Sequence, residues 1–214
     1  MAAEAHLVSI YQLKSRFQSL LRPAVKKLYQ WGVTANQVTL VALILSVLLG
    51  LFLSLPDTPV ILFWLIPPWM LLRMALNAID GMLAREFGQQ SHLGAYLNEL
   101  ADVVADSALM LPFVFLAGVA PMLPLALIFF AFLTEFTGVL GLMVGASRRY
   151  DGPMGKSDRA FGLGLLACLV AAQMINPSWL NGCLSVMLFL TMITVIHRVR
   201  RGLEEVASAK KDCL

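Results

Sequence analysis

The chain has 214 residues, of which 59% are hydrophobic and only 14% are charged, and its formal net charge is +3. A soluble domain of this size needs far more polar surface, so the composition excludes an ordinary soluble protein. The basic residues form no patch interleaved with aromatic residues, which argues against a nucleic-acid-binding protein.

The first predicted element is an amphipathic helix over residues 7–31. Its apolar residues recur at helical spacing, and lysines and arginines cluster between them. This pattern is typical of a helix that lies on a membrane surface. We expect Pro23 to break or bend this helix. Thr34 and Asn36 then offer capping side chains just before the next element.

Six membrane spans are predicted to follow. A hydrocarbon layer of ~30 Å requires about 20 apolar residues in helical form. The stretches that meet this requirement are residues 37–56, 59–79, 95–117, 121–146, 160–176 and 180–197. Pro67 and Pro68 are expected to interrupt the second span. We therefore predict an all-α polytopic membrane protein with a single domain over residues 1–214, built on a six-helix bundle over residues 35–200.

The distribution of basic residues predicts the orientation of the spans. Lysines and arginines precede the first span, follow the second, lie between the fourth and fifth, and follow the sixth. The three opposite connections, near residues 56–59, 117–121 and 176–181, contain neither Lys nor Arg. By the positive-inside rule, both termini and the charged connections are cytoplasmic, which also places the amphipathic helix on the cytoplasmic face.

Polar residues recur in this sequence where a membrane disfavours them. On a helix, Arg73, Asn77 and Asp80 share one face. On the next predicted helix, every fourth residue is Gly94, Asn98, Asp102 or Asp106. The two helices are joined by a short connection, so these faces can look at each other across an antiparallel pair.

Carboxylates in such a place carry a large desolvation cost unless they are paired or bind cations. Oxygen ligands suit Mg²⁺ or Mn²⁺, and these ions in turn suit a phosphate-bearing substrate. Helix packing and ion transport are the alternative explanations, but a whole set of polar residues on one face favours a cation site. Gly81 and Gly94 leave room for a ligand or for close helix approach.

Two short motifs in this region resemble a known family. The sequence N-A-I-D-G-M-L-A-R (residues 77–85) is followed by eight residues and then by G-A-Y-L-N-E-L-A-D (residues 94–102). This resembles the signature D-x-x-D-G-x-x-A-R followed by G-x-x-x-D-x-x-x-D of the CDP-alcohol phosphatidyltransferases. The identical positions are Asp80, Gly81, Ala84, Arg85, Gly94 and Asp102. The stretch from Thr34 to Thr39 also looks like the segment that opens the first span of this family.

The resemblance implies transfer of a phosphatidyl group from CDP-diacylglycerol to a small alcohol, with release of CMP, in phospholipid biosynthesis. In the family, four aspartates hold two metal ions, and the fourth is the proposed base; that position is Asp102 here. The first and third aspartates are replaced by Asn77 and Asn98. The expected ligands of Mg²⁺ or Mn²⁺ are therefore Asp80 and Asp102 with the two amides, and Asp106 as a possible third carboxylate. By the same resemblance, Gly81, Ala84, Arg85 and Gly94 are expected to line the nucleotide.

The alcohol is expected to bind near basic residues on the cytoplasmic side. In related enzymes such residues hold the phosphate of a phosphorylated alcohol, and the matching candidates here are Arg148, Lys156, Arg159 and Arg198. The resemblance thus favours glycerol 3-phosphate or another phosphorylated polyol. The alternative is that these cations only obey the positive-inside rule and bind anionic lipid head groups. Glu135, in the middle of the fourth span, is a candidate partner for Arg73.

Two other functions stay open at this point. The two asparagines at signature positions would suit an inactive family member that serves as a lipid-binding scaffold. A small transporter is disfavoured, because the polar residues lie near one membrane face and the spans show no inverted repeat. The resemblance further implies a homodimer and a bacterial inner membrane location.

Overall fold

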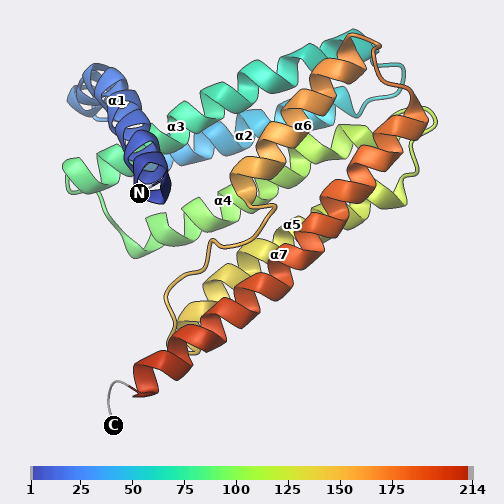
Figure 1. Ribbon diagram of the computed structural model, residues 1–214. Helices are drawn as coiled ribbons and strands as arrows, with labels where there is room; N and C mark the ends of the chain where they lie inside the picture. Colours follow the sequence, from blue (N-terminus) through green and yellow to red (C-terminus); the bar gives the residue numbers. More distant parts are fainter. Residues whose placement is uncertain (1, 212–214) are drawn as a thin grey trace. The chain divides into compact units, whose positions relative to one another are not determined.

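The computed structural model describes the backbone of residues 2–211 and the side chains of residues 16–209. Every element in that part of the chain is helical (Figure 1), which confirms the all-α prediction. The elements are α1 (Ala2–Gln30), α2 (Ala35–Leu53), the 3-10 helix η1 (Val60–Leu65), α3 (Ile66–Glu86), α4 (His92–Met110), the 3-10 helix η2 (Leu111–Phe115), α5 (Met122–Met143), α6 (Lys156–Ala171) and α7 (Pro177–Lys211).

Helices cover all six predicted spans, but they differ in their ability to cross a membrane. By length and composition, four segments suffice: Ala35–Leu53, Val60–Glu86, Met122–Met143 and Pro177–Ala209. Helix α4 contains three acidic residues, and α6 has only 16 residues. The count of six spans and the cytoplasmic location of both termini therefore stay predictions.

The prolines act differently in α1 and in the second span. Pro67 and Pro68 interrupt the span as expected, since η1 ends at Leu65 and α3 begins at Ile66. There the prolines occupy the first turn of α3, where their missing N–H groups cost nothing. Of the predicted break or bend at Pro23, the break is wrong, because α1 continues through Pro23 to Gln30. Pro23 and Ser19 are both exposed, so water can satisfy the carbonyl that the proline leaves without a donor.

The chain divides into two compact units. Unit 1 comprises the residues up to Ile44 together with Leu71–Asp102, and unit 2 comprises Leu45–Met70 together with the residues from Val103 onward. Helices α2, α3 and α4 each contribute residues to both units.

The core of unit 1 joins the end of α1 to α2 and α3. Val25 of α1 is fully buried, and Leu21 and Leu28 on the same face pack against this core. Its other buried members are Ala35, Val38, Ile79, Met82 and Leu83. Arg22, Lys26 and Lys27 of α1 are exposed. This part of α1 is therefore amphipathic, with its apolar face directed at unit 1; its attachment to a membrane surface stays a prediction.

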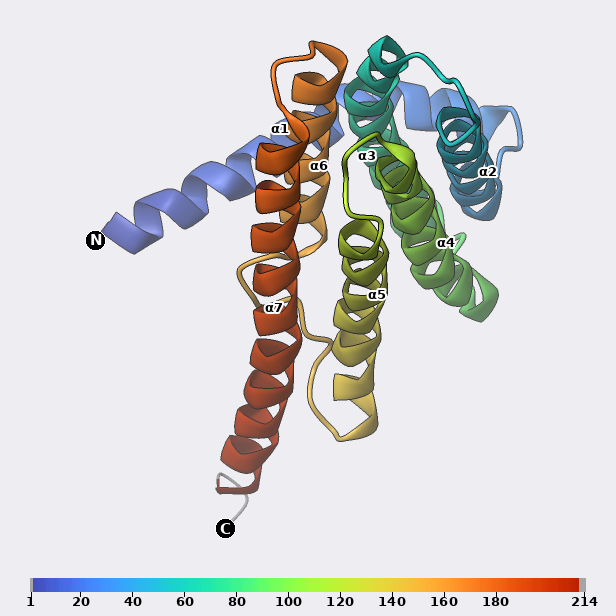
Figure 2. The same ribbon diagram turned by 90° about the vertical axis from the view of Figure 1, so that its right-hand side faces the viewer.

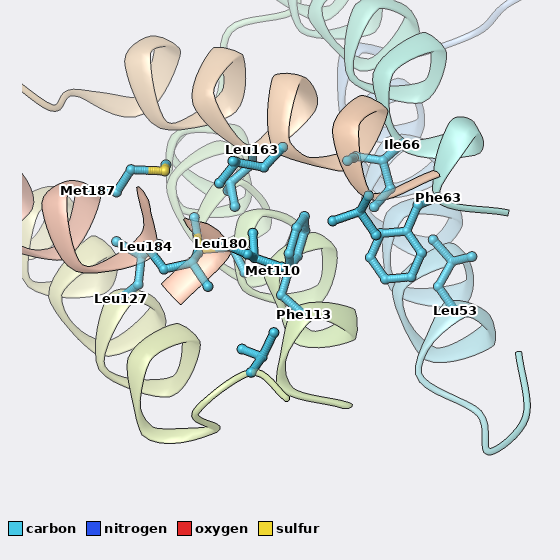
Figure 3. Packing of buried hydrophobic residues seen from close by; sticks show 14 of the residues in the cluster. Leu53, Phe63, Ile66, Met110, Phe113, Leu127, Leu163, Leu180, Leu184 and Met187 are labelled. Atoms are coloured by element: carbon cyan, nitrogen blue, oxygen red, sulfur yellow. The ribbon is translucent and has the colours of Figure 1, made fainter. Parts of the chain in front are cut away.

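The core of unit 2 is a larger apolar cluster (Figure 3). Phe113 of η2, Leu127 of α5 and Leu184 of α7 are fully buried, and Leu163 of α6 is nearly so. Phe63 meets Phe113 edge to face, with ring centroids 5.4 Å apart. Helices α5 and α7 run side by side (Figures 1 and 2), and α7 continues well past the end of α5.

A close helix crossing in unit 2 gives a test of this packing. A Cβ atom on Gly50 of α2 would lie 2.1 Å from the carbonyl oxygen of Ala108 on α4, and backbone cannot move aside as a side chain can. We expect Gly50→Ala to destabilise the protein by about 1–3 kcal/mol through overpacking. The melting temperatures of the variant and the parent protein in detergent measure this loss of stability.

Gly182→Ala is the matched control, since no atom lies within 4 Å of a Cβ at this position in α7. Because alanine favours a helix more than glycine does, this change should be neutral or slightly stabilising. Equal melting temperatures for the two variants would contradict the close crossing at Gly50.

Candidate active site

The site in unit 1 begins with the N-terminus of α2. The Thr34 hydroxyl accepts a hydrogen bond from the Gln37 N–H (3.3 Å), and the Thr34 N–H donates to the Gln37 side chain (2.9 Å). This reciprocal pair is a capping box and confirms that Thr34 caps the helix. Gln89, in the connection between α3 and α4, accepts a hydrogen bond from the Ala35 N–H (2.7 Å). These bonds fix the first turn of α2 and with it Asn36 and Thr39.

Asp80 lies on α3 and is buried, with 6% of its surface exposed. Its carboxylate accepts a hydrogen bond from the Thr39 hydroxyl of α2 (Oγ1 to Oδ2, 2.8 Å). The same hydroxyl lies 3.1 Å from the Ala35 carbonyl oxygen, one turn earlier. Since a single hydroxyl proton serves both acceptors, it is shared between the carboxylate and the helix backbone. Thr39 thus fixes one oxygen of Asp80.

Asp102 lies on α4 and meets two donors from α3. Its Oδ1 accepts hydrogen bonds from Arg73 Nη2 (3.2 Å) and from Asn77 Nδ2 (3.1 Å). Arg73 also donates to the Asp102 backbone carbonyl (3.1 Å). The predicted meeting of the two polar faces is therefore observed for Arg73, Asn77 and Asp102.

The glycines of the motif lie beneath polar side chains. A Cβ on Gly81 would lie 2.8 Å from Arg85 Nη2, so the Arg85 guanidinium lies over this glycine. A Cβ on Gly94 would lie 2.8 Å from Asn36 Oδ1 and 3.0 Å from the Ser91 hydroxyl oxygen. Both glycines therefore allow side chains of this chain to approach the backbone closely, and their predicted role beside a ligand stays a prediction.

The remaining predicted residues are placed as follows. Asn98 is half-buried on α4, between Gly94 and Asp102 in sequence. Ala84 is half-buried against the core of unit 1. Asp106 follows Asp102 by one turn on α4 and belongs to unit 2.

The chemistry of the donor set fits a hard divalent cation. The four signature positions carry two carboxylates and two amides, and carboxylate and amide oxygens are ligands for Mg²⁺ and Mn²⁺. Within the part of the chain that the structure describes, no three Asp, Glu, His or Cys side chains form a group suited to a metal ion. The set thus has less negative charge than a site with four carboxylates.

Three of the four basic residues predicted to bind the alcohol gather around Glu135 in unit 2. Arg159 of α6 forms an ion pair with Glu135 of α5 (3.0 Å). Arg148, from the connection after α5, and Arg198 of α7 each lie 3.5 Å from the other carboxylate oxygen. Three guanidinium groups thus surround one carboxylate. The expectation that Glu135 pairs with Arg73 is wrong, because the partners of Glu135 are these arginines and Arg73 pairs with Asp102.

Arg159 and Arg198 are almost completely buried, with 1% and 2% of their surfaces exposed. Arg159 Nη1 donates to the Thr134 hydroxyl (3.0 Å) and to the Met154 carbonyl (3.1 Å), whereas its Nε is buried and has no hydrogen-bond partner in the described structure. Arg198 donates to the backbone carbonyls of Thr134 and Asp151. Lys156 is the half-buried first residue of α6.

Sequence reasoning missed the central place of Glu135 and the contribution of Thr134. The available signal was a glutamate within an apolar helix, which must find a cation. The sequence offered several cations, and only the packing of α5 against α6 and α7 selects among them.

Comparison with known proteins identifies the family. The sequence profile of CDP-alcohol phosphatidyltransferases matches residues 32–199. An inner membrane protein of Escherichia coli K12, YnbA, is 49% identical over 193 residues, which cover 90% of this chain and 96% of YnbA. An archaetidylinositol phosphate synthase of Aeropyrum pernix is 30% identical over 128 residues, or 60% of this chain and 64% of that protein.

Solved structures show the same fold. Phosphatidylinositol phosphate synthase PgsA1 of Mycobacterium tuberculosis, with CDP-DAG bound, superimposes with a TM-score of 0.68 at 18% sequence identity, covering 86% of this chain and 92% of that one. The structure of the same enzyme in complex with manganese and citrate also superimposes with a TM-score of 0.68, covering 85% of this chain and 88% of that one. This chain therefore belongs to the CDP-alcohol phosphatidyltransferase family of membrane enzymes, which transfer a phosphorylated lipid group from a CDP-linked donor to an alcohol.

Proposed function

We propose that this chain transfers the phosphatidyl group of CDP-diacylglycerol to a phosphorylated polyol, such as glycerol 3-phosphate, with release of CMP. The observation that carries the proposal is the pair of signature carboxylates, Asp80 and Asp102, held in unit 1 by hydrogen bonds from neighbouring helices. The retained Gly81 and Arg85 of the motif support a nucleotide-linked donor. The mycobacterial neighbour was solved with CDP-DAG bound, which agrees with this donor.

A divalent cation, Mg²⁺ or Mn²⁺, belongs to this proposal. Asp80 and Asp102 are its proposed ligands, together with Asn77 and Asn98, while Asp106 is a further candidate. The manganese in the structure of the mycobacterial enzyme supports the choice. When bound, the cation neutralises the pyrophosphate and the charge that develops on the departing CMP. Gly81, Ala84, Arg85 and Gly94 are proposed to contact the nucleotide.

The proposed reaction is a displacement at phosphorus. The alcohol oxygen forms a new bond to the phosphorus of the phosphatidyl group, and the pyrophosphate bond to CMP breaks. Asp102, at the base position of the family, accepts the hydroxyl proton of the alcohol. Its bonds to Arg73 and Asn77 orient the carboxylate for this role.

The cluster around Glu135 supports a phosphorylated acceptor. Three guanidinium groups around one carboxylate leave an excess of positive charge in this cluster. In addition, the N–H group at the buried Arg159 Nε has no acceptor among the described residues. Arginine is well suited to phosphate, because its planar fork of donors matches phosphate oxygens. The archaeal relative and the mycobacterial neighbour are both named as synthases of phosphorylated inositol lipids, which also favours an acceptor that carries phosphate. Lys156, the first residue of α6, is a further candidate.

We place the enzyme in a bacterial inner membrane with both termini in the cytoplasm, from the inner membrane relative YnbA and the distribution of basic residues. A homodimer is proposed from the family resemblance. The second candidate function is a lipid-binding scaffold without turnover, and the observation that favours it is the presence of Asn77 and Asn98 at two signature aspartate positions.

The first experiment is an assay of CMP release. We expect purified protein in detergent to release CMP from CDP-diacylglycerol only with Mn²⁺ or Mg²⁺ and one phosphorylated acceptor from a panel that includes glycerol 3-phosphate, inositol phosphate and serine. Asp102→Asn should reduce the rate at least about 100-fold, the lower range for loss of a general base.

The two candidate functions give different results in this assay. Metal-dependent turnover establishes the transferase. Binding of CDP-diacylglycerol without CMP release from any acceptor would refute the transferase and support the scaffold. An Asp102→Asn protein as active as the parent would refute Asp102 as the base.

A second prediction concerns the Thr39 hydroxyl, which fixes Asp80. Thr39→Val keeps the shape of the side chain but removes the hydrogen bond to the carboxylate. We expect the metal concentration for half-maximal CMP release to rise at least about tenfold, the lower range for loss of one hydrogen bond to a charged group. Thr39→Ser, which retains the hydroxyl, is the control. Identical metal dependence in the Val and Ser variants would show that Thr39 has no part in positioning Asp80.

A third prediction separates two adjacent arginines. Arg148 is partly exposed and lies beside Glu135, whereas Arg149 pairs with Asp151 (2.8 Å) and Glu205. We expect Arg148→Gln to raise the KM for the phosphorylated acceptor about tenfold, within the range for a lost charged hydrogen bond, and to leave the KM for CDP-diacylglycerol unchanged. Arg149→Gln is the matched control and should leave both constants near those of the parent. The reverse pattern would remove Arg148 from the acceptor site.

A further inference from the structure

One face of α7 holds the connection between α5 and α6 (residues 144–155). The Thr194 hydroxyl accepts a hydrogen bond from the Met154 N–H near the end of this connection (3.0 Å). One turn later on α7, Arg198 Nε donates to the Asp151 carbonyl oxygen (3.2 Å). The connection therefore follows α7 and is fixed to it at successive turns.

Glu205 continues this face of α7 and binds the start of the connection. It lies seven positions after Arg198, which is two helical turns along the same face. Its Oε1 accepts a hydrogen bond from the Ser147 N–H (3.0 Å), and its Oε2 accepts from the Ser147 hydroxyl (2.9 Å) and pairs with Arg149. With 37% of the Glu205 side chain exposed, the ion pair alone contributes little. The two bonds to Ser147 fix the backbone itself, because one of them comes from a main-chain N–H.

Arg148 lies between the two residues that Glu205 binds. Ser147 and Arg149 direct their side chains to Glu205 on α7, whereas Arg148 reaches Glu135 on α5 (3.5 Å). The Arg149 N–H also donates to a backbone carbonyl of α5, that of Gly138 (3.1 Å). The backbone on both sides of Arg148 is thus fixed, and this directs its guanidinium into the cluster around Glu135.

We infer that Glu205 is a positioning residue for the acceptor site, because it keeps Arg148 in the cluster of arginines around Glu135. It acts through Ser147 and is not assigned a contact with the acceptor. The inference rests on the proposed function and deepens it, since it adds to the acceptor site a residue beyond the range 32–199 that the family profile matches.

The test measures the Kd for inorganic phosphate by isothermal titration calorimetry of the purified protein in detergent. This readout requires no turnover. We expect Glu205→Ala to raise the Kd about tenfold, to the value of Arg148→Gln, because an arginine that is no longer held loses its charged hydrogen bond to phosphate. A Kd for Glu205→Ala equal to that of the parent would overturn the inference, and so would a parent protein that does not bind phosphate.

Two further variants separate hydrogen bonding from charge. In Glu205→Gln the amide oxygen can accept from the Ser147 N–H and the amide nitrogen can donate to the Ser147 hydroxyl, so the Kd should stay within about threefold of the parent. Glu204→Ala is the control for a carboxylate lost from α7, since Glu204 pairs only with the exposed Arg201 among the described residues, and it should match the parent. Equal losses in Glu205→Gln and Glu205→Ala would show that the charge matters rather than the bonds to Ser147, and would overturn the inference.

A double variant tests whether Glu205 acts through Arg148. Glu205→Ala combined with Arg148→Gln should bind phosphate no more weakly than Arg148→Gln alone, because both changes remove the same contact. Independent effects would add to a loss of about a hundredfold, and this result would contradict the proposed role.

Hydrogen exchange and CMP release complete the experiment. The Ser147 N–H should exchange faster in Glu205→Ala than in the parent and at the parent's rate in Glu204→Ala, whereas slow exchange in Glu205→Ala would count against the inference. In the assay of CMP release, Glu205→Ala should raise the KM for the phosphorylated acceptor and leave kcat and the KM for CDP-diacylglycerol unchanged.

Failure of the inference is distinct from failure of the proposed function. Unchanged phosphate binding in Glu205→Ala together with CMP release by the parent would refute only the inference. The expected loss of phosphate binding, in a protein that releases no CMP with any acceptor, would refute only the transferase.

Discussion

A charged side chain within an apolar helix must find a partner, and Glu135 shows how strongly this constraint acts. Removing a carboxylate from water costs several kcal/mol, which only good pairing offsets. The partners of Glu135 come from three other segments: Arg148 from the connection after α5, Arg159 from α6 and Arg198 from α7. One carboxylate on α5 thus ties together the polar part of unit 2. Because Arg198 and Arg159 also donate to backbone carbonyls, the connection between α5 and α6 is held in the same network.

The same constraint acts on the buried charges of unit 1. There the buried guanidinium of Arg73 pairs with the carboxylate of Asp102. In unit 2 three guanidinium groups serve one carboxylate. A surplus of guanidinium groups suits a ligand that carries phosphate, which is the ground for the proposed acceptor.

The sequence predicted the helices well and the pairing of charges only in part. Apolar stretches of sufficient length appear as helices in every case, and the prolines at 67 and 68 mark the start of α3. The meeting of Asn77 with Asp102 also followed from helical spacing and a short connection. Helical spacing and connection length do not predict the partners of Glu135, which lie up to 63 positions away in sequence. Which arginine it meets depends on which helices pack together, and apolar periodicity does not encode that choice.

Helix boundaries were the other limit of the sequence. The fifth span was predicted to begin at residue 160, yet α6 begins at Lys156, where the Asp158 side chain accepts a hydrogen bond from the Gly155 N–H (2.9 Å). Arg159 therefore lies in the first helical turn and points into the protein. A helix end that is fixed by one capping side chain looks like a loop in sequence, because charged residues are common in both.

Asn77 and Arg73 act together on Asp102. An aspartate at position 77 would place a second carboxylate within about 3 Å of Asp102, an arrangement that is stable only with a proton or a cation between the two groups. The amide replaces that repulsion with a hydrogen bond of 3.1 Å. Arg73 then satisfies the remaining charge on Asp102 from the same helix face. The polar faces of α3 and α4 therefore meet through hydrogen bonds between their own side chains.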